Sequence, residues 1–243
     1  MPVLTGAGRA ARAYADTADT EGHPRRTVVF DLDGTLADTS ADLLAAANAC
    51  FRGLGHGDLL DQRDVLTAFH GGRAMLRLGF GRLGVVSEAM VDAQYPVLLE
   101  AYAGAIDRHT RMYPGAVEAV QALRGAGYAT AVCTNKPEGL AETLLQRLGV
   151  RDLFAALVGA DTLLVRKPDP APLFEAIRRA GGDARRALLV GDTATDRDTG
   201  RAAGVPVALV TFGPEGAGVA RLDPEALLER CEDLGGVAAR LIR

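Results

Sequence analysis

The chain has 243 residues, of which 48% are hydrophobic and 24% charged, and its formal net charge is −4. This balance is typical of one large globular domain with or without a smaller insert, and no basic stripe favours nucleic acid as a partner. No apolar run reaches the roughly 18 residues of a membrane span. Three scattered cysteines fit a reduced, cytoplasmic protein better than a disulfide framework or a zinc site.

The first half of the chain predicts an extension, one strand and a helical insert. Residues 1–26 show no apolar period and no apolar run of the secretory kind, so we expect a disordered extension. Residues 27–32 form a β-branched and aromatic run, which predicts a buried strand. Residues 40–107 show helical patterns without a strand-like run, and we interpret them as a helical insert.

From residue 108 onward, short apolar runs alternate with helical patterns. This rhythm is typical of a parallel sheet with helices on both faces, so the sequence predicts an α/β core built from residues 27–39 and 108–243. A last helix is expected near the C-terminus, and another is expected to start at Pro224 with Asp223 as its cap. The predicted strands are 129–133, 156–158, 187–190 and 206–210, and the helices between them are 116–124, 138–148, 170–180 and 195–203.

Polar residues follow three of the predicted strands at the end where open α/β sheets bind ligands. Four carboxylates gathered there would repel one another, and the lysine on the loop before Pro168 cannot balance them. A hard divalent cation can, and oxygen ligands beside a phosphate favour Mg²⁺. The residues concerned are Asp31 and Asp33 after the first strand, Thr134 and Asn135 after the second, Asp192 and Asp196 after the fourth, and Lys167 on the loop.

These residue types supply the parts that phosphoryl transfer needs. Asp31 is the candidate nucleophile, which would form an aspartyl-phosphate. Asp33 is the candidate acid that protonates the leaving alkoxide and then the base that activates water. The Thr134 hydroxyl and nearby backbone N–H groups would hold the phosphoryl oxygens, and Lys167 would offset negative charge.

Four motifs in order resemble the haloacid dehalogenase superfamily in its phosphatase branch, with phosphoglycolate phosphatases as the nearest relatives. The resemblance covers residues 28–212 and implies a Rossmann-like core with a helical cap inserted after the first strand. It also implies Mg²⁺ held by Asp31, the backbone carbonyl of Asp33 and Asp192, with Asp196 acting directly or through water. The candidate phosphate-binding residues are Thr134, Asn135 and Lys167. The motifs are Asp31-Leu32-Asp33-Gly34-Thr35, Thr134-Asn135-Lys136, Lys167-Pro168-Asp169-Pro170 and Gly191-Asp192-Thr193-Ala194-Thr195-Asp196.

Within the helical insert, a glycine-rich turn at residues 69–73 lies about where relatives of this superfamily read their substrates. Arg73 is a candidate for pairing with a substrate carboxylate, because a guanidinium forks onto such a group. The alternative is that Arg73 is a solvated residue at the start of a helix.

The sequence therefore predicts a Mg²⁺-dependent phosphatase that hydrolyses a small, phosphoglycolate-like phosphomonoester through an aspartyl-phosphate, as a monomer or homodimer. A sugar-phosphate mutase or a pyrophosphatase on the same scaffold stays open. A catalytically inactive regulatory member is the alternative of a different class, against which the intact set of motif residues argues. A dehalogenase is disfavoured because that branch lacks the second aspartate of the first motif, whereas Asp33 is present here.

Overall fold

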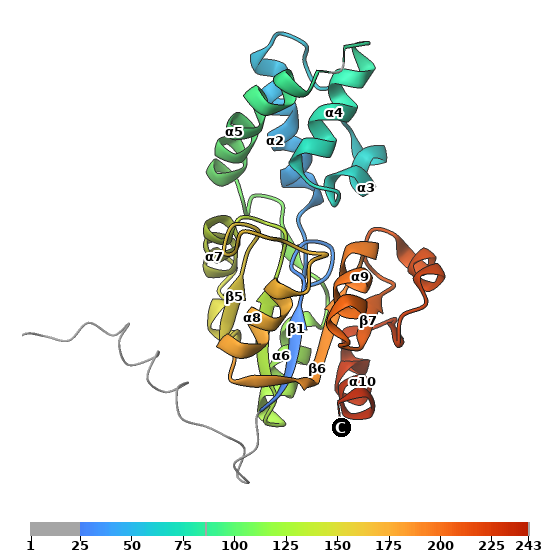
Figure 1. Ribbon diagram of the computed structural model, residues 1–243. Helices are drawn as coiled ribbons and strands as arrows, with labels where there is room; N and C mark the ends of the chain where they lie inside the picture. Colours follow the sequence, from blue (N-terminus) through green and yellow to red (C-terminus); the bar gives the residue numbers. More distant parts are fainter. Residues whose placement is uncertain (1–24, 86, 243) are drawn as a thin grey trace, which may run out of the picture.

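The computed structural model describes residues 25–85 and 87–242, so the extension expected at residues 1–26 falls almost wholly outside the described chain (Figure 1). A six-stranded sheet forms the centre of the larger part, and all its strand pairs are parallel. This confirms the predicted α/β class with a parallel, Rossmann-like sheet. The order is β5 (Ala156–Val158), β4 (Ala129–Cys133), β1 (Arg25–Phe30), β6 (Gly182–Gly191), β7 (Val207–Val210) and β8 (Ala226–Leu228).

Strand β1 lies in the middle because its residues are apolar on both faces. Val28 and Phe30 point into one apolar cluster and Val29 into a second, as the alternation of side chains along a strand requires. Helix α8 (Ala171–Arg179) packs into the second cluster, while α6 (Ala116–Gly125), α7 (Glu138–Arg147) and α10 (Leu234–Leu241) pack into the first. Helix α9 (Ala194–Ala203) contacts β6 and β7, and the 3₁₀ turns η2 (Arg151–Leu153), η3 (Gly216–Leu222) and η4 (Cys231–Asp233) connect these elements.

The prediction of a helix starting at Pro224 is wrong. Asp223 has a left-handed backbone with φ 52° and ends η3 rather than starting a helix, and residues 226–228 instead form β8. Ala226 pairs with Ala208 and Leu228 with Val210 at the edge of the sheet. Ala226, Leu227 and Leu228 are strong helix formers with no β-branched residue among them, so the tertiary pairing with β7 decides this conformation.

Residues 40–104, here called the helical lobe, lie beyond the carboxyl ends of the strands at the top of Figure 1. Phe51 and Phe80 meet edge to face with ring centroids 5.4 Å apart, and both are fully buried. Among the described residues, no helix combines the length and apolarity needed to cross a membrane. The lobe consists of α2 (Ser40–Gly53), η1 (Gln62–Asp64), α3 (Val65–Ala68), α4 (Gly72–Arg82) and α5 (Glu88–Gly104).

Two chain segments join the helical lobe to the sheet, and they are bound to each other. Strand β2 (Ala37–Asp38) pairs antiparallel with β3 (Arg111–Met112). Above this pair, the buried Asp42 carboxylate accepts hydrogen bonds from the backbone N–H groups of His109 and Thr110 and from the Thr110 hydroxyl. The outgoing and returning segments therefore form one double-stranded neck.

Candidate active site

The predicted site residues come together at the carboxyl ends of β1, β4 and β6. Asp31 directly follows β1, and its backbone N–H donates to the Val190 carbonyl of β6 at 2.9 Å. The Asp31 Oδ1 atom accepts from the backbone N–H of Leu32 at 2.7 Å, which turns the side chain at the strand end. The central position of β1 between β4 and β6 thus places Asp31 in the middle of the site.

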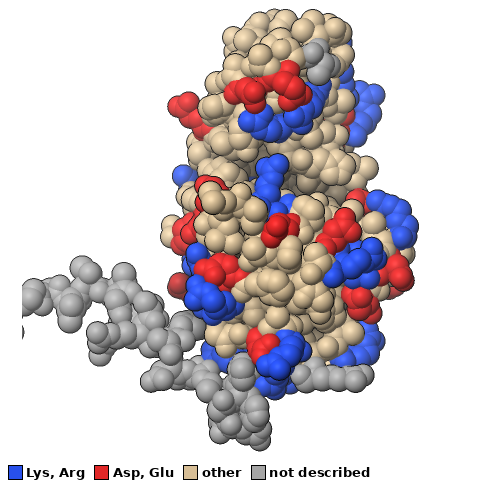
Figure 2. Space-filling view, in the orientation of Figure 1, with Lys and Arg blue, Asp and Glu red and all other residues tan. Residues whose placement is uncertain are grey.

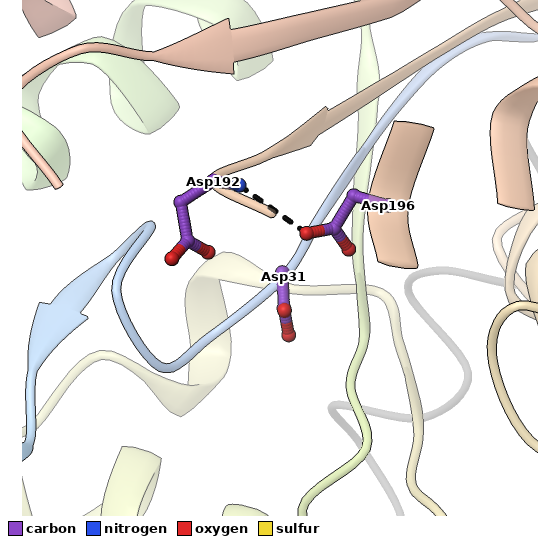
Figure 3. Close-up of side chains that lie close together, drawn as sticks. All are labelled: Asp31, Asp192 and Asp196. Atoms are coloured by element: carbon purple, nitrogen blue, oxygen red, sulfur yellow. Dashed lines mark hydrogen bonds between the residues drawn. The ribbon is translucent and has the colours of Figure 1, made fainter. Parts of the chain in front are cut away.

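Three carboxylates converge here. One oxygen from each of Asp31, Asp192 and Asp196 lies within 4.8 Å of the others, as the close-up shows (Figure 3). Burial raises the pKa of Asp31 to about 6, although Lys167 lowers it. Burial, followed by the negative charges of Asp196 and Asp31, also raises the pKa of Asp192 well above its ordinary value. Without a cation, ionising these carboxylates therefore costs free energy, because they are buried and repel one another.

Asp192 has one carboxylate oxygen that the described chain leaves without a partner. Its Oδ1 atom accepts from the Thr35 hydroxyl at 2.8 Å, but its buried Oδ2 atom has no hydrogen-bond partner among the described residues. Gly34, with φ +81°, lies against that oxygen, and a Cβ added there would come within 2.3 Å of it. The first motif thus needs glycine both for its positive φ and because a side chain there would collide with this oxygen.

The charges at the site fit a hard divalent cation. Four aspartates and two lysines lie at these strand ends, which leaves a formal charge of −2. A buried acceptor without a donor costs free energy unless an ion or water contacts it. Oxygen-only ligands of this kind suit Mg²⁺.

Lys167 links two of the carboxylates. Its Nζ atom lies 2.7 Å from Asp196 Oδ1 and 3.1 Å from Asp31 Oδ2, and the residue is 2% exposed. Burial lowers the pKa of Lys167, but Asp196 and Asp31 outweigh this effect and hold it above its ordinary value, so the ammonium stays charged. Asp196 Oδ2 accepts from the backbone N–H groups of Asp192 and Thr193 and from the Thr193 hydroxyl. Both Asp196 oxygens are therefore already engaged.

Asp33 lies outside this cluster and has its own partners. Its Oδ1 atom accepts from the Thr39 hydroxyl at 2.7 Å and from the Lys136 ammonium at 2.8 Å. Burial lowers the pKa of Lys136, but Asp33 and then Tyr102 hold it above its ordinary value. Lys136 belongs to the second motif, but no role was predicted for it from the sequence. One signal was present, because only two of the 27 lysine and arginine residues are lysine, Lys136 and Lys167.

Two hydrogen bonds of the second motif stabilise the loop after β4. The Thr134 hydroxyl accepts from the backbone N–H of Lys136 at 3.2 Å, and Thr134 lines the pocket described below. The Asn135 amide donates to the Lys167 carbonyl at 3.0 Å and so ties the second motif to the third. Thr35, which donates to Asp192, is another contact residue that the sequence reasoning did not single out.

A pocket of about 590 Å³ separates these residues from the helical lobe. Asp31, Asp33 and Thr134 line its floor, and residues 69–74 of the lobe line it from the other side. Arg73 also lines the pocket, where it forms an ion pair with Asp92 and lies 4.6 Å from the Tyr95 ring centroid. Its role in substrate binding stays a prediction.

Comparison with known proteins gives one consistent family. Residues 28–210 match the haloacid dehalogenase-like hydrolases. A phosphoglycolate phosphatase of Mesorhizobium japonicum is 42% identical over 224 residues, which cover 90% of this chain and 97% of the relative. A phosphoglycolate phosphatase of Agrobacterium fabrum is 37% identical over 202 residues, which cover 83% of this chain and 87% of that protein.

The fold agrees with a solved structure. The crystal structure of a predicted phosphoglycolate phosphatase from Haemophilus somnus superposes with a TM-score of 0.78 at 24% identity. The superposition covers 88% of this chain and 97% of the other. At this identity the likeness concerns the fold alone.

Proposed function

The chain belongs to the haloacid dehalogenase-like hydrolases, and from that premise we propose that it is a Mg²⁺-dependent phosphoglycolate phosphatase. The observation that carries the proposal is the buried Asp192 oxygen without a hydrogen-bond partner, clustered with Asp31, which lines the pocket. The relatives named phosphoglycolate phosphatase, which match nearly the whole chain, support the choice of substrate.

In the proposed reaction, the Asp31 carboxylate attacks phosphorus, the bond to the ester oxygen breaks, and an aspartyl-phosphate forms. Asp33 donates its proton to the departing oxygen, so the leaving group departs as an alcohol. Asp33 then takes a proton from the water that attacks the aspartyl-phosphate, and inorganic phosphate leaves. Lys167, 3.1 Å from Asp31, offsets negative charge, and the Thr134 hydroxyl donates to the phosphoryl group.

Asp31, the Asp33 backbone carbonyl and Asp192 would hold the cation, with Asp196 contributing through water because the chain already engages both its carboxylate oxygens. When bound, Mg²⁺ neutralises negative charge on the carboxylates and the phosphoryl oxygens. The predicted cap, residues 40–107, which contains the helical lobe, would exclude water from the pocket, and Arg73 would pair with the substrate carboxylate.

We also propose a cytoplasmic setting and a small-molecule partner. The described cysteines, Cys50, Cys133 and Cys231, are free thiols, as expected of a cytoplasmic protein. Acidic and basic side chains lie next to one another on the face shown in Figure 2, without a basic tract that would suit nucleic acid. A small phosphate ester is thus the proposed partner of the monomer or homodimer.

The test is phosphate release from a panel of esters with Mg²⁺ and with excess chelator. We expect phosphoglycolate to be hydrolysed fastest, with free phosphate as product, and chelation to abolish turnover. Asp31→Asn should lower kcat about 10³-fold or more. The matched control Asp198→Asn changes an exposed acid on α9 and should leave the rate unchanged. An isomerised sugar phosphate instead of free phosphate would identify the mutase alternative.

A further inference from the structure

Lys136 stands out because lysine is rare in this chain, in which nearly all lysine and arginine residues are arginine. Of 27 lysine and arginine residues, the two lysines both lie in the candidate active site, where they are 7% and 2% exposed. Lys167 contacts the proposed nucleophile Asp31, and Lys136 contacts the proposed acid Asp33. An ammonium is compact and fits a buried position beside one oxygen, whereas a guanidinium needs room for a planar fork.

The contacts of Lys136 fix which oxygen of Asp33 is free. Lys136 Nζ and the Thr39 hydroxyl both donate to Oδ1. Within the described chain, Oδ2 of Asp33 accepts no hydrogen bond, and Asp33 lines the pocket. The oxygen that is left over is therefore the one that can exchange a proton with a bound ester.

The helical lobe holds the ammonium from its other side. Lys136 Nζ lies 4.4 Å from the ring centroid of Tyr102, which comes from α5 and is 2% exposed. A cation over an aromatic face is attracted by the ring electrons, and more strongly when both are removed from water. Lys136 is thus fixed between the lobe and Asp33, rather than free to sample rotamers.

We propose that Lys136 is a positioning residue for proton transfer: its ammonium fixes Oδ1 of Asp33 so that Oδ2 faces the leaving oxygen of the substrate. This inference rests on the proposed phosphatase function. Lys136 also lines the pocket, but in this assignment it acts through Asp33 and not on the phosphate or the nucleophile. Its effect should therefore depend on how much the leaving group needs a proton.

The test compares two esters. Phosphoglycolate releases a basic alkoxide that needs the proton, whereas p-nitrophenyl phosphate releases a stable phenolate that does not. We expect Lys136→Met to lower kcat/KM about 100-fold for phosphoglycolate but less than about 5-fold for p-nitrophenyl phosphate. We use kcat/KM because it reports the first irreversible step, in which the leaving group departs.

Two further variants make the comparison specific. Lys167→Met is the matched control, since Lys167 contacts the nucleophile, and it should lower both rates by the same factor. Lys136→Arg keeps the charge but not the compact head, and it should change the ratio of the two rates in the same direction as Lys136→Met. The ratio within one preparation is independent of the folded fraction, so partial misfolding of a variant does not affect it.

Equal losses on both esters in Lys136→Met and Lys136→Arg would overturn the proposal, because a merely structural role lowers both. That result is distinct from failure of the proposed substrate. If the wild type hydrolyses another alkyl phosphate and not phosphoglycolate, the substrate assignment is wrong, and the same ratio measured on that ester still decides the role of Lys136.

Discussion

Replacing Asp192 by asparagine should stabilise the metal-free protein and remove its response to Mg²⁺. Asparagine has nearly the same shape, and its carbonyl oxygen can still accept from the Thr35 hydroxyl. The change removes a negative charge that is 1% exposed and clustered with Asp31 and Asp196. The variant should thus be more stable than the wild type without metal but gain less stability from Mg²⁺. A general loss of structure would lower the stability in both conditions.

The magnitude follows from the cluster. Two unit charges at 4.8 Å, the upper limit of the separations in the cluster, repel by about 3.5 kcal/mol at an effective dielectric constant of about 20. Lys167 offsets part of this, so we expect a net gain of about 2 kcal/mol, or about 4–8 °C in Tm for a chain of this size. Mg²⁺ at about 100 times its Kd should add about 2.7 kcal/mol to the wild type and little to Asp192→Asn.

The difference in stability between metal-free Asp192→Asn and metal-free wild type should grow as the pH rises. Burial raises the pKa values of Asp31, to about 6, and of Asp192. An acid whose folded pKa exceeds its unfolded value contributes stability below the unfolded pKa, and that contribution is lost as pH rises through the folded pKa. Metal-free wild type should therefore lose stability from about pH 4 to above pH 6, while Asp192→Asn loses less.

The assay is thermal unfolding with chelator and with Mg²⁺ at pH 5 and pH 8. Asp198→Asn, which removes an exposed charge from the helix α9 that follows Asp192, is the matched control and should behave like the wild type. A metal-free Asp192→Asn protein that melts below the wild type and keeps its Mg²⁺-induced rise in Tm would refute the assignment of Asp192 as a cation ligand.

Two further predictions concern the helical lobe. Gly79→Ala should lower the free energy of unfolding by about 1–3 kcal/mol in urea, because the added Cβ would lie 2.1 Å from the Phe51 ring. Gly104→Ala, where a Cβ meets nothing within 4 Å, is its control, and equal stability of the two variants would contradict this packing. Arg73→Ala should raise KM for phosphoglycolate about 10-fold and change kcat little; unchanged kinetics for every small ester would remove Arg73 from the site.

Much of the core could be predicted from local sequence. The apolar run at Val28–Phe30 and the alternation after residue 108 fix β1, β4 and most of the helices, because each signal lies within one element. The three-residue strand β8 could not be predicted, since only its pairing with β7 distinguishes it from the start of a helix. The two-residue strands β2 and β3 are missed for the same reason.

The candidate site was predictable as a set of residues but not as a set of contacts. Turns after β1, β4 and β6 place the aspartates and Thr134 at one edge of the sheet, which the motif order already indicates. The partner of Asp33, in contrast, lies 103 residues away at Lys136. Asn135 bonds the Lys167 carbonyl, a contact that depends on how two loops fold over the strands.

The double-stranded neck has a mechanical consequence. Because β2 and β3 are hydrogen-bonded and Asp42 binds the returning segment, neither connection can bend alone. A rotation of the lobe relative to the sheet would therefore have to bend both segments together, at the β2–β3 pair. A chain cleaved in the loop after α2 should therefore keep both fragments together, because the segments on either side of the cut are both bonded to the neck.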